Sequence, residues 1–197
     1  YFLLREVTFG NDGVFNNELF ILKTNADLSN LLGNLVSRTI SMVEKYFGGV
    51  IPSQKEILDV DLNLINNVKN LKNIVTKNMD ELKISNALSE IFNVISLSNK
   101  YIDETEPWVL GKDESKKDRL GTVLYNLCES IRVVSTLLSP FMPDTSLKIK
   151  QKLNYKLDNF DSIENFDGTE SGVSINKGEN LFPRIDVEKK LEELKNS

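Results

Sequence analysis

Apolar side chains recur at helical spacing along most of this chain, and short polar joints separate one run from the next. The spacing predicts long helices over residues 16–47, 61–79, 84–103 and 115–138, and a shorter one over residues 145–153. Gly48, Gly49 and Pro52 are expected to end the first helix, and Pro140 and Pro143 to end the fourth. Because long helices with short joints cover one another's apolar stripes, we predict an all-α fold, an antiparallel helix bundle.

The composition divides the chain into three parts. Residues 1–15 are apolar and then glycine-rich, and their abrupt beginning predicts a linker from a preceding part of a longer protein. Residues 16–153 carry the helical pattern and form the predicted bundle. Residues 154–197 begin with a stretch rich in Asp, Asn, Gly and Ser, which predicts an irregular surface tail that ends in a charged helix or a linker.

The overall composition indicates a soluble globular protein, with 40% hydrophobic and 27% charged residues. No apolar run approaches the roughly 20 residues that cross a bilayer, and the first residues lack a signal-peptide pattern. We therefore expect no membrane partner and a cytoplasmic location. Cys128 is the single cysteine, which excludes a disulfide framework and a cysteine zinc site, and we interpret it as a buried structural thiol.

Charge and residue usage narrow the functional classes. The net charge of −5 weighs against a general nucleic-acid binder, so any RNA site must be a local patch. The absence of histidine removes the commonest general base and the commonest metal ligand. The sequence has no glycine-rich phosphate loop and no carboxylate pair marked as convergent. An independent enzyme is therefore disfavoured, and we predict no catalytic and no metal-binding residue here.

A polar stripe runs along the first predicted helix, one residue away from the apolar stripe. It consists of Asn34, Arg38, Ser41 and Lys45, at positions i, i+4, i+7 and i+11. One interpretation is a solvated helix face, which is what most such stripes are. The other is an edge that reads unpaired RNA bases, because Asn offers a donor beside an acceptor and Arg offers a planar fork of donors.

Trp108, the only tryptophan, directly follows Pro107, and a proline stops a helix at the residue before it. The ring is therefore expected at a helix end, either as a core or interface residue or as a platform for one unpaired base, worth roughly 1–3 kcal/mol. The carboxylates of the same run disfavour a phosphate nearby and are placed to orient Lys100 or Arg38. The proximity of Lys100 to Trp108 makes that lysine a candidate phosphate contact.

Distinctive blocks follow one another along the chain, in the order YFLLRE, FGNDG, DLSNLLGNLVSRTISMVEKYF, NKYIDETEPW, LLSPFMP and LFPRID. In this order they resemble the methionyl-tRNA synthetases, class I aminoacyl-tRNA synthetases, in their helical anticodon-binding domain. The resemblance implies that the bundle binds the anticodon loop of tRNA(Met) and reads CAU. By the GNLVSRT match, Asn34 and Arg38 would contact bases, and by the EPW match Trp108 would stack on one. Lys45 stands where some members carry an arginine, and it keeps the charge without the planar fork.

The resemblance also implies a longer parent enzyme that joins methionine to its tRNA through a methionyl-adenylate, with ATP and Mg as cofactors and Zn as an option. The HIGH-type motif, the KMSKS loop and the zinc knuckle do not occur in these 197 residues, so we expect neither ligase activity nor a cofactor from them alone. Residues 181–185 would return toward the catalytic domain, which is thereby a predicted partner, whereas DNA is not. Two alternatives stay open: a protein-interaction bundle, and the corresponding domain of an isoleucine or valine enzyme.

Overall fold

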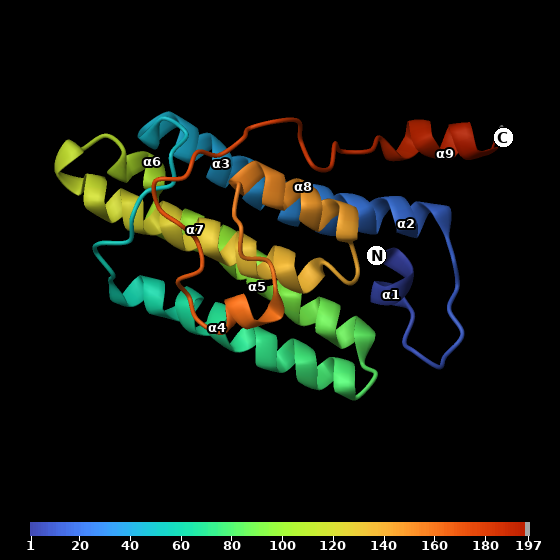
Figure 1. Cartoon of the computed structure of the whole chain (residues 1–197). Helices are drawn as coiled ribbons and strands as arrows, with labels where there is room; N and C mark the ends of the chain where they lie inside the picture. The colour runs from blue at the N-terminus through green and yellow to red at the C-terminus, as the bar shows by residue number, and fades with distance from the viewer. Residues whose placement is uncertain (196–197) are drawn as a thin grey trace.

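Helices make up the regular structure of the computed structural model, which describes residues 1–195 (Figure 1). The longer helices are α3 (Asn34–Phe47), α4 (Asp59–Asp80), α5 (Ile84–Thr105), α7 (Lys117–Leu138) and α8 (Pro143–Leu153). The shorter ones are α1 (Phe2–Glu6), α2 (Asn17–Lys23), α6 (Pro107–Leu110) and α9 (Val187–Lys195). The remaining elements are the π-helix η1 (Thr24–Gly33) and the 3-10 turns η2 (Glu114–Lys116) and η3 (Phe160–Ile163). The predicted all-α antiparallel bundle is confirmed.

The first predicted helix runs from Asn17 to Phe47, but its winding is not uniform. Asn16 caps its start by accepting a bond from a backbone N–H of the first turn, and Gly48 ends it in the left-handed region at φ 59°. Between α2 and α3 the ten residues Thr24–Gly33 wind as a π-helix, which differs from the regular α-helix that we expected. A short apolar run fits both windings, so its spacing alone does not separate them.

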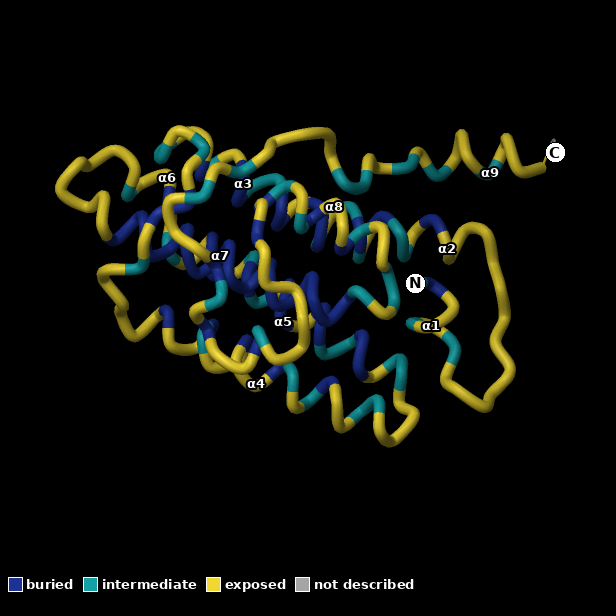
Figure 2. Tube along the Cα trace, in the orientation of Figure 1, coloured by how far each residue is buried: buried dark blue, intermediate teal, exposed yellow. Residues whose placement is uncertain are grey.

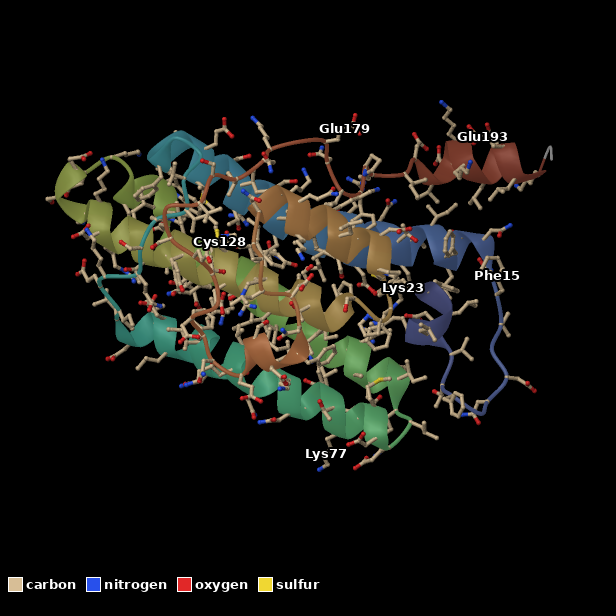
Figure 3. All side chains as sticks on the ribbon, in the orientation of Figure 1. Phe15, Lys23, Lys77, Cys128, Glu179 and Glu193 are labelled. Atoms are coloured by element: carbon tan, nitrogen blue, oxygen red, sulfur yellow. The ribbon has the colours of Figure 1, made fainter. Side chains whose placement is uncertain are left out.

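Helix α7 lies at the centre of the bundle, and every residue from Arg119 to Leu138 is buried (Figure 2). Helices α3, α4, α5 and α8 all contact it. The helix predicted over residues 115–138 is confirmed, but it is buried on all sides, whereas apolar spacing predicts burial of one stripe only. Cys128 lies fully buried within α7, as predicted (Figure 3), and burial raises the pKa of its thiol to about 12.

Tail residues 154–169 cross α7 and supply partners for two of its charged side chains. Glu129 and Arg132 form an ion pair of 2.7 Å, and neither side chain is exposed to solvent. The backbone N–H of Gly168 and the hydroxyl of Thr169 donate to Glu129, at 3.0 and 2.6 Å. Arg132 in turn donates to two carbonyl oxygens of the same segment. These bonds satisfy charges that would otherwise be costly to bury, so this segment is part of the packed fold.

We call residues 172–185 the strap, because they pass beside α3 and are fastened at both ends (Figure 1). At one end, backbone bonds of 2.9 and 2.8 Å join the strap to Ile51 and Gly49, just after α3. At the other end, the side-chain amide of Asn25 in η1 exchanges two bonds of 2.8 Å with the backbone of Ile185. The strap is therefore held against the first helical region along its length.

An aromatic cluster joins α1 to α2, beside the contact of α1 with α5. The ring centroids of Phe2, Phe15 and Phe20 lie 5.3 to 5.9 Å apart. Tyr1 packs on Phe92 of α5 at 5.2 Å. The chain also exposes large apolar side chains in this region, namely Leu3, Phe9, Val14 and Leu22. This end of the bundle consequently presents apolar surface to solvent.

Candidate nucleic-acid interface

The polar stripe of the first predicted helix lies on α3 where that helix meets α5. Asn34 is exposed, and its amide nitrogen lies 3.5 Å from Oδ1 of Asn99 in α5. Asn99 is itself held, because its amide nitrogen donates to the carbonyl oxygens of Leu31 and Ile95 at 3.2 and 3.1 Å. Asn34 therefore presents an oriented amide, and within residues 1–195 its side-chain oxygen accepts no hydrogen bond.

Arg38 lies one turn further along the same helix and pairs with Asp103 of α5. The distance from Nη2 to Oδ1 is 2.8 Å, and the two side chains are 30% and 64% exposed. The expectation that a carboxylate near Trp108 orients Arg38 is confirmed. An exposed pair of this kind contributes less than about 1 kcal/mol to stability, so its main consequence is the orientation of the guanidinium fork. The other donors of Arg38 bond to nothing in the described part of the chain.

The two candidate lysines lie on different elements. Lys100 pairs with Glu104, one turn later on α5, at an N–O distance of 3.1 Å. Lys45 lies over the ring of Tyr46, 4.9 Å from its centroid. That ring packs so closely on Gly111 that a Cβ there would come within 2.3 Å of it. Glycine thus allows the end of α3 to approach the turn that follows α6.

Trp108 lies on a short helix that follows a break in the chain. Helix α5 ends at Thr105, Glu106 adopts a left-handed φ of 43°, and Pro107 opens α6. The predicted helix stop before the proline is confirmed. The Trp108 side chain belongs to a residue that is 39% exposed, so it is neither a core residue nor a fully projecting one. Across residues 1–195, no aromatic ring packs on Trp108 and its indole N–H has no hydrogen-bond partner.

A buried polar network holds α5 behind these residues. Tyr101 lies between Lys100 and Asp103 in sequence, but its ring is buried and its hydroxyl donates to Asp61 of α4. Arg119 of α7 donates two bonds of 2.7 and 2.8 Å to the same carboxylate. Burial, together with the bond to Asp61, raises the pKa of Tyr101, so its hydroxyl stays protonated and keeps donating. This network was not predictable from the sequence, because nothing in the spacing separates its charged residues from surface charges.

A hollow of about 510 Å³ lies beside Asn34, between α3 and the strap. Asn34 and Ser37 line it from α3, and Asn180 and Arg184 line it from the strap. The Ser37 hydroxyl lies 3.5 Å from the side-chain oxygen of Asn180, across 143 positions of sequence. The strap residues were not predicted to lie beside the polar stripe, because they carry no motif that indicates this contact.

The five predicted residues do not form one cluster of direct contacts. Asn34 and Arg38 lie together against α5, which also carries Lys100. Lys45 is at the end of α3, and Trp108 is on α6, beside the turn that this end contacts. Among the described residues, no hydrogen bond, ion pair or ring contact joins Trp108 to the other four. The roles of all five stay predictions.

Comparison with known proteins finds several similar to this chain. Residues 51–196 match the family described as the anticodon binding domain of methionyl tRNA ligase. The methionine–tRNA ligase of Clostridium tetani is 56% identical over 194 residues, which cover 98% of this chain and 30% of that protein. The ligase of Bacillus subtilis is 43% identical and covers 99% of this chain and again 30% of that protein. The chain therefore spans about 30% of the length of these curated relatives.

Solved structures show the same similarity. The ligand-free crystal structure of Mycobacterium tuberculosis methionyl-tRNA synthetase superposes on this chain with a TM-score of 0.89 at 34% identity. The match covers 94% of this chain and 38% of that one. A structure of the same Mycobacterium tuberculosis protein bound by methionyl-adenylate gives a TM-score of 0.88.

Proposed function

Because the chain belongs to the methionyl-tRNA synthetase family and carries its anticodon-binding domain, we propose that it binds the anticodon loop of tRNA(Met) and reads CAU. The observation that carries the proposal is the pair Asn34 and Arg38, whose polar edges are oriented by α5 and keep unused hydrogen-bonding capacity. Amide and guanidinium edges of this kind read unpaired bases. The family match excludes the alternative of an isoleucine or valine enzyme.

In this proposal the anticodon bases unstack and spread over α3, α5 and α6. Trp108 holds one base by its face, which contributes roughly 1–3 kcal/mol. Asn34 and Arg38 test the hydrogen-bonding edges of other bases. A wrong base leaves polar groups unpaired at the interface, which costs roughly 1–3 kcal/mol for each group and exceeds the net gain from an ordinary hydrogen bond.

The charges near the stripe support contacts to bases more than contacts to phosphates. The cations are Arg38, Lys45 and Lys100, and the carboxylates are Asp103, Glu104 and Glu106. Arg38 and Lys100 already have carboxylate partners, whereas Lys45 has none within 4.0 Å in the described part of the chain. We assign Lys45 and Lys100 to phosphates at the edge of the loop, because exposed ion pairs such as that of Lys100 are weak enough to exchange partners.

The names of the relatives support a wider proposal for the full-length protein, namely that it ligates methionine to tRNA with ATP and Mg. This chain matches the anticodon-binding domain and spans about 30% of its relatives, so none of its residues is assigned to that reaction. Zn, where it is used, would likewise belong to the remainder of the parent enzyme. The proposed location is the cytoplasm. Among residues 1–195, every helix is too short or too polar to cross a membrane.

The apolar end of the bundle supports the proposal that the protein's own catalytic domain packs there. Leu3, Phe9 and Val14 are 62%, 63% and 87% exposed, around the aromatic cluster of α1 and α2. Several exposed large apolar side chains near one another in sequence and beside an aromatic cluster support a surface that another domain covers. The proposed reading residues lie on α3, α5 and α6, and none of them belongs to the aromatic cluster.

Tryptophan fluorescence tests the proposed function, because Trp108 is the only tryptophan and the signal has one source. We expect a hairpin with the CAU anticodon to quench the signal at concentrations where a hairpin with a changed anticodon does not. Equal quenching by both hairpins contradicts the proposal. If neither hairpin binds and the fluorescence of Trp108 does not change, the alternative of a protein-interaction bundle is favoured.

The variant Arg38→Ala tests the reading role directly. We expect its preference for CAU to fall by about tenfold, because one unsatisfied interface contact corresponds to about 1.4 kcal/mol. Lys72→Ala is the matched control, since it also removes a paired cation, 2.9 Å from Glu164 and 3.9 Å from Asp161, and lies on α4. An unchanged preference in folded Arg38→Ala, or an equal loss in Lys72→Ala, contradicts the assignment.

A further inference from the structure

Two hollows adjoin each other at the strap and share Asn180 and Leu181. The hollow beside α3 is the one of about 510 Å³ that contains Asn34. The other has about 340 Å³ and lies against Lys148 and Lys152 of α8. A smaller hollow of about 50 Å³ touches both α3 and Lys152. We call the three together the strap groove, and it leads from the proposed reading face to α8.

Unpaired cations line the α8 side of the strap groove. Lys148, Lys152 and Lys177 have no carboxylate within 4.0 Å in the described part of the chain. This is notable in a protein with 24 basic and 29 acidic side chains, where most cations at the reading face are already paired. Glu179 also lines the groove but forms no ion pair with these lysines. An unpaired cluster of cations in a recess favours an anionic ligand.

Lys152 is held in place by the strap. Its ammonium donates to the carbonyl oxygen of Lys177, and a Cβ at Gly178 would come within 3.1 Å of it. Burial lowers the pKa of Lys152, while nearby Glu179 raises it. The strap itself is fastened here, because Asn176 donates from its backbone and side chain to the last carbonyl groups of α8, at 2.7 and 2.8 Å. The groove therefore carries a positioned charge on a fixed backbone.

We propose that the strap groove binds backbone phosphates of the RNA stem that adjoins the anticodon loop, with Lys148, Lys152 and Lys177 as the contacts. The proposal rests on the proposed function, because it assumes that the loop lies on Asn34. The groove leads from that residue to α8, which lies well away from α6 and Trp108 (Figure 1). Among residues 1–195, no aromatic ring on which a base could stack lines its α8 side, whereas lysine binds phosphate as a compact point charge.

The double variant Lys148→Glu/Lys177→Glu tests this proposal. Lys152 is left unchanged because it holds the strap. The matched control is Lys69→Glu/Lys77→Glu, which makes the same charge change on exposed lysines of α4 that also lack a carboxylate partner among residues 1–195. Figure 3 shows Lys77 on the opposite side of the molecule from Glu179 of the strap. Circular dichroism confirms that each variant is folded.

The measurement is the affinity for anticodon-arm hairpins, with the CAU anticodon and with a changed one, across a range of salt concentrations. Each lost phosphate contact reduces the slope of log K against log salt by about 0.7–0.9. We expect the groove variant to lose about 1.5 in slope and at least about tenfold in affinity at 0.1 M salt, by the same factor for both hairpins. The neutral pair Lys148→Gln/Lys177→Gln is expected to show the same loss of slope.

A slope in the groove variant equal to that of the α4 control overturns the proposal. A loss confined to the CAU hairpin also overturns it, because phosphate contacts carry no base information. Failure of the proposed function looks different. In that case the unaltered chain shows no preference for CAU at all, whereas failure of the groove leaves the preference and the salt slope of the variant intact.

Discussion

Glu129 offers the sharpest test of how the tail is held on α7. Its oxygens accept two bonds from Arg132, at 2.8 and 2.7 Å, and one each from Gly168 and Thr169. The variant Glu129→Gln keeps the shape of the side chain but removes its charge and replaces one acceptor oxygen by a donor. Whichever oxygen is replaced, at least one of the two bonds from Arg132 is then lost, and Arg132 remains buried without a counter-charge.

Breaking one partner of a buried ion pair costs about 3–5 kcal/mol. The free energy of unfolding of a single domain is about 5–15 kcal/mol, so Glu129→Gln is expected to remove about a fifth of it or more. The double variant Glu129→Gln/Arg132→Met removes the buried charge as well. We expect it to recover at least about 1 kcal/mol relative to the sum of the two single variants, because paired charges are not additive.

Urea unfolding followed by circular dichroism measures these free energies. Glu114→Gln is the matched control, because Glu114 also pairs three residues along its chain, with Lys117 at 2.7 Å, but at the surface. We expect the control to lose less than about 1 kcal/mol. A loss in Glu129→Gln no larger than that in Glu114→Gln would refute the reasoning that the tail and α7 share one buried charge network.

Two further predictions concern the thiol and the strap. Burial raises the pKa of Cys128 to about 12, so it stays a neutral thiol between pH 7 and pH 9. Mass spectrometry after treatment with an alkylating reagent at pH 8 should find Cys128 unmodified in the native protein and fully modified in urea. Stoichiometric labelling of the native protein contradicts this. Asn25→Ala removes both bonds to Ile185, so limited proteolysis of the strap should be faster than in wild type, whereas Asn93→Ala, on an exposed face of α5, should leave its rate unchanged.

Apolar spacing predicted the long helices because the apolar stripe of each helix ends where the sequence has a polar joint, a glycine or a proline. The helices expected over residues 61–79 and 84–103 are Asp59–Asp80 and Ile84–Thr105 in the structure. The complete burial of α7 was not predictable in the same way. Charged residues such as Glu129 and Arg132 are typical of a solvent-exposed helix face. The groups that cover them lie about 25 to 40 positions later, in an irregular segment.

Sequence spacing could indicate only the part of the candidate site whose side chains lie on one helix. Asn34 and Arg38 were recognised from a spacing of four residues, and the break before Trp108 from the preceding proline. The partners that orient the stripe, such as Asn99, come from another helix, and an amide on a helix has no distinguishing pattern in sequence. The strap groove depends on contacts between segments about 140 residues apart, which no local pattern encodes.

The π-helix η1 determines how far α3 is rotated about its axis relative to α2. A π-helix turns less per residue than an α-helix, so a change in the winding or the length of Thr24–Gly33 would rotate α3 against α2. Asn34 and Arg38 would then face a different neighbour while α2 kept its place. The number of residues between Asn16 and Asn34, and their winding, therefore set the direction of the proposed reading face together with the identity of its side chains.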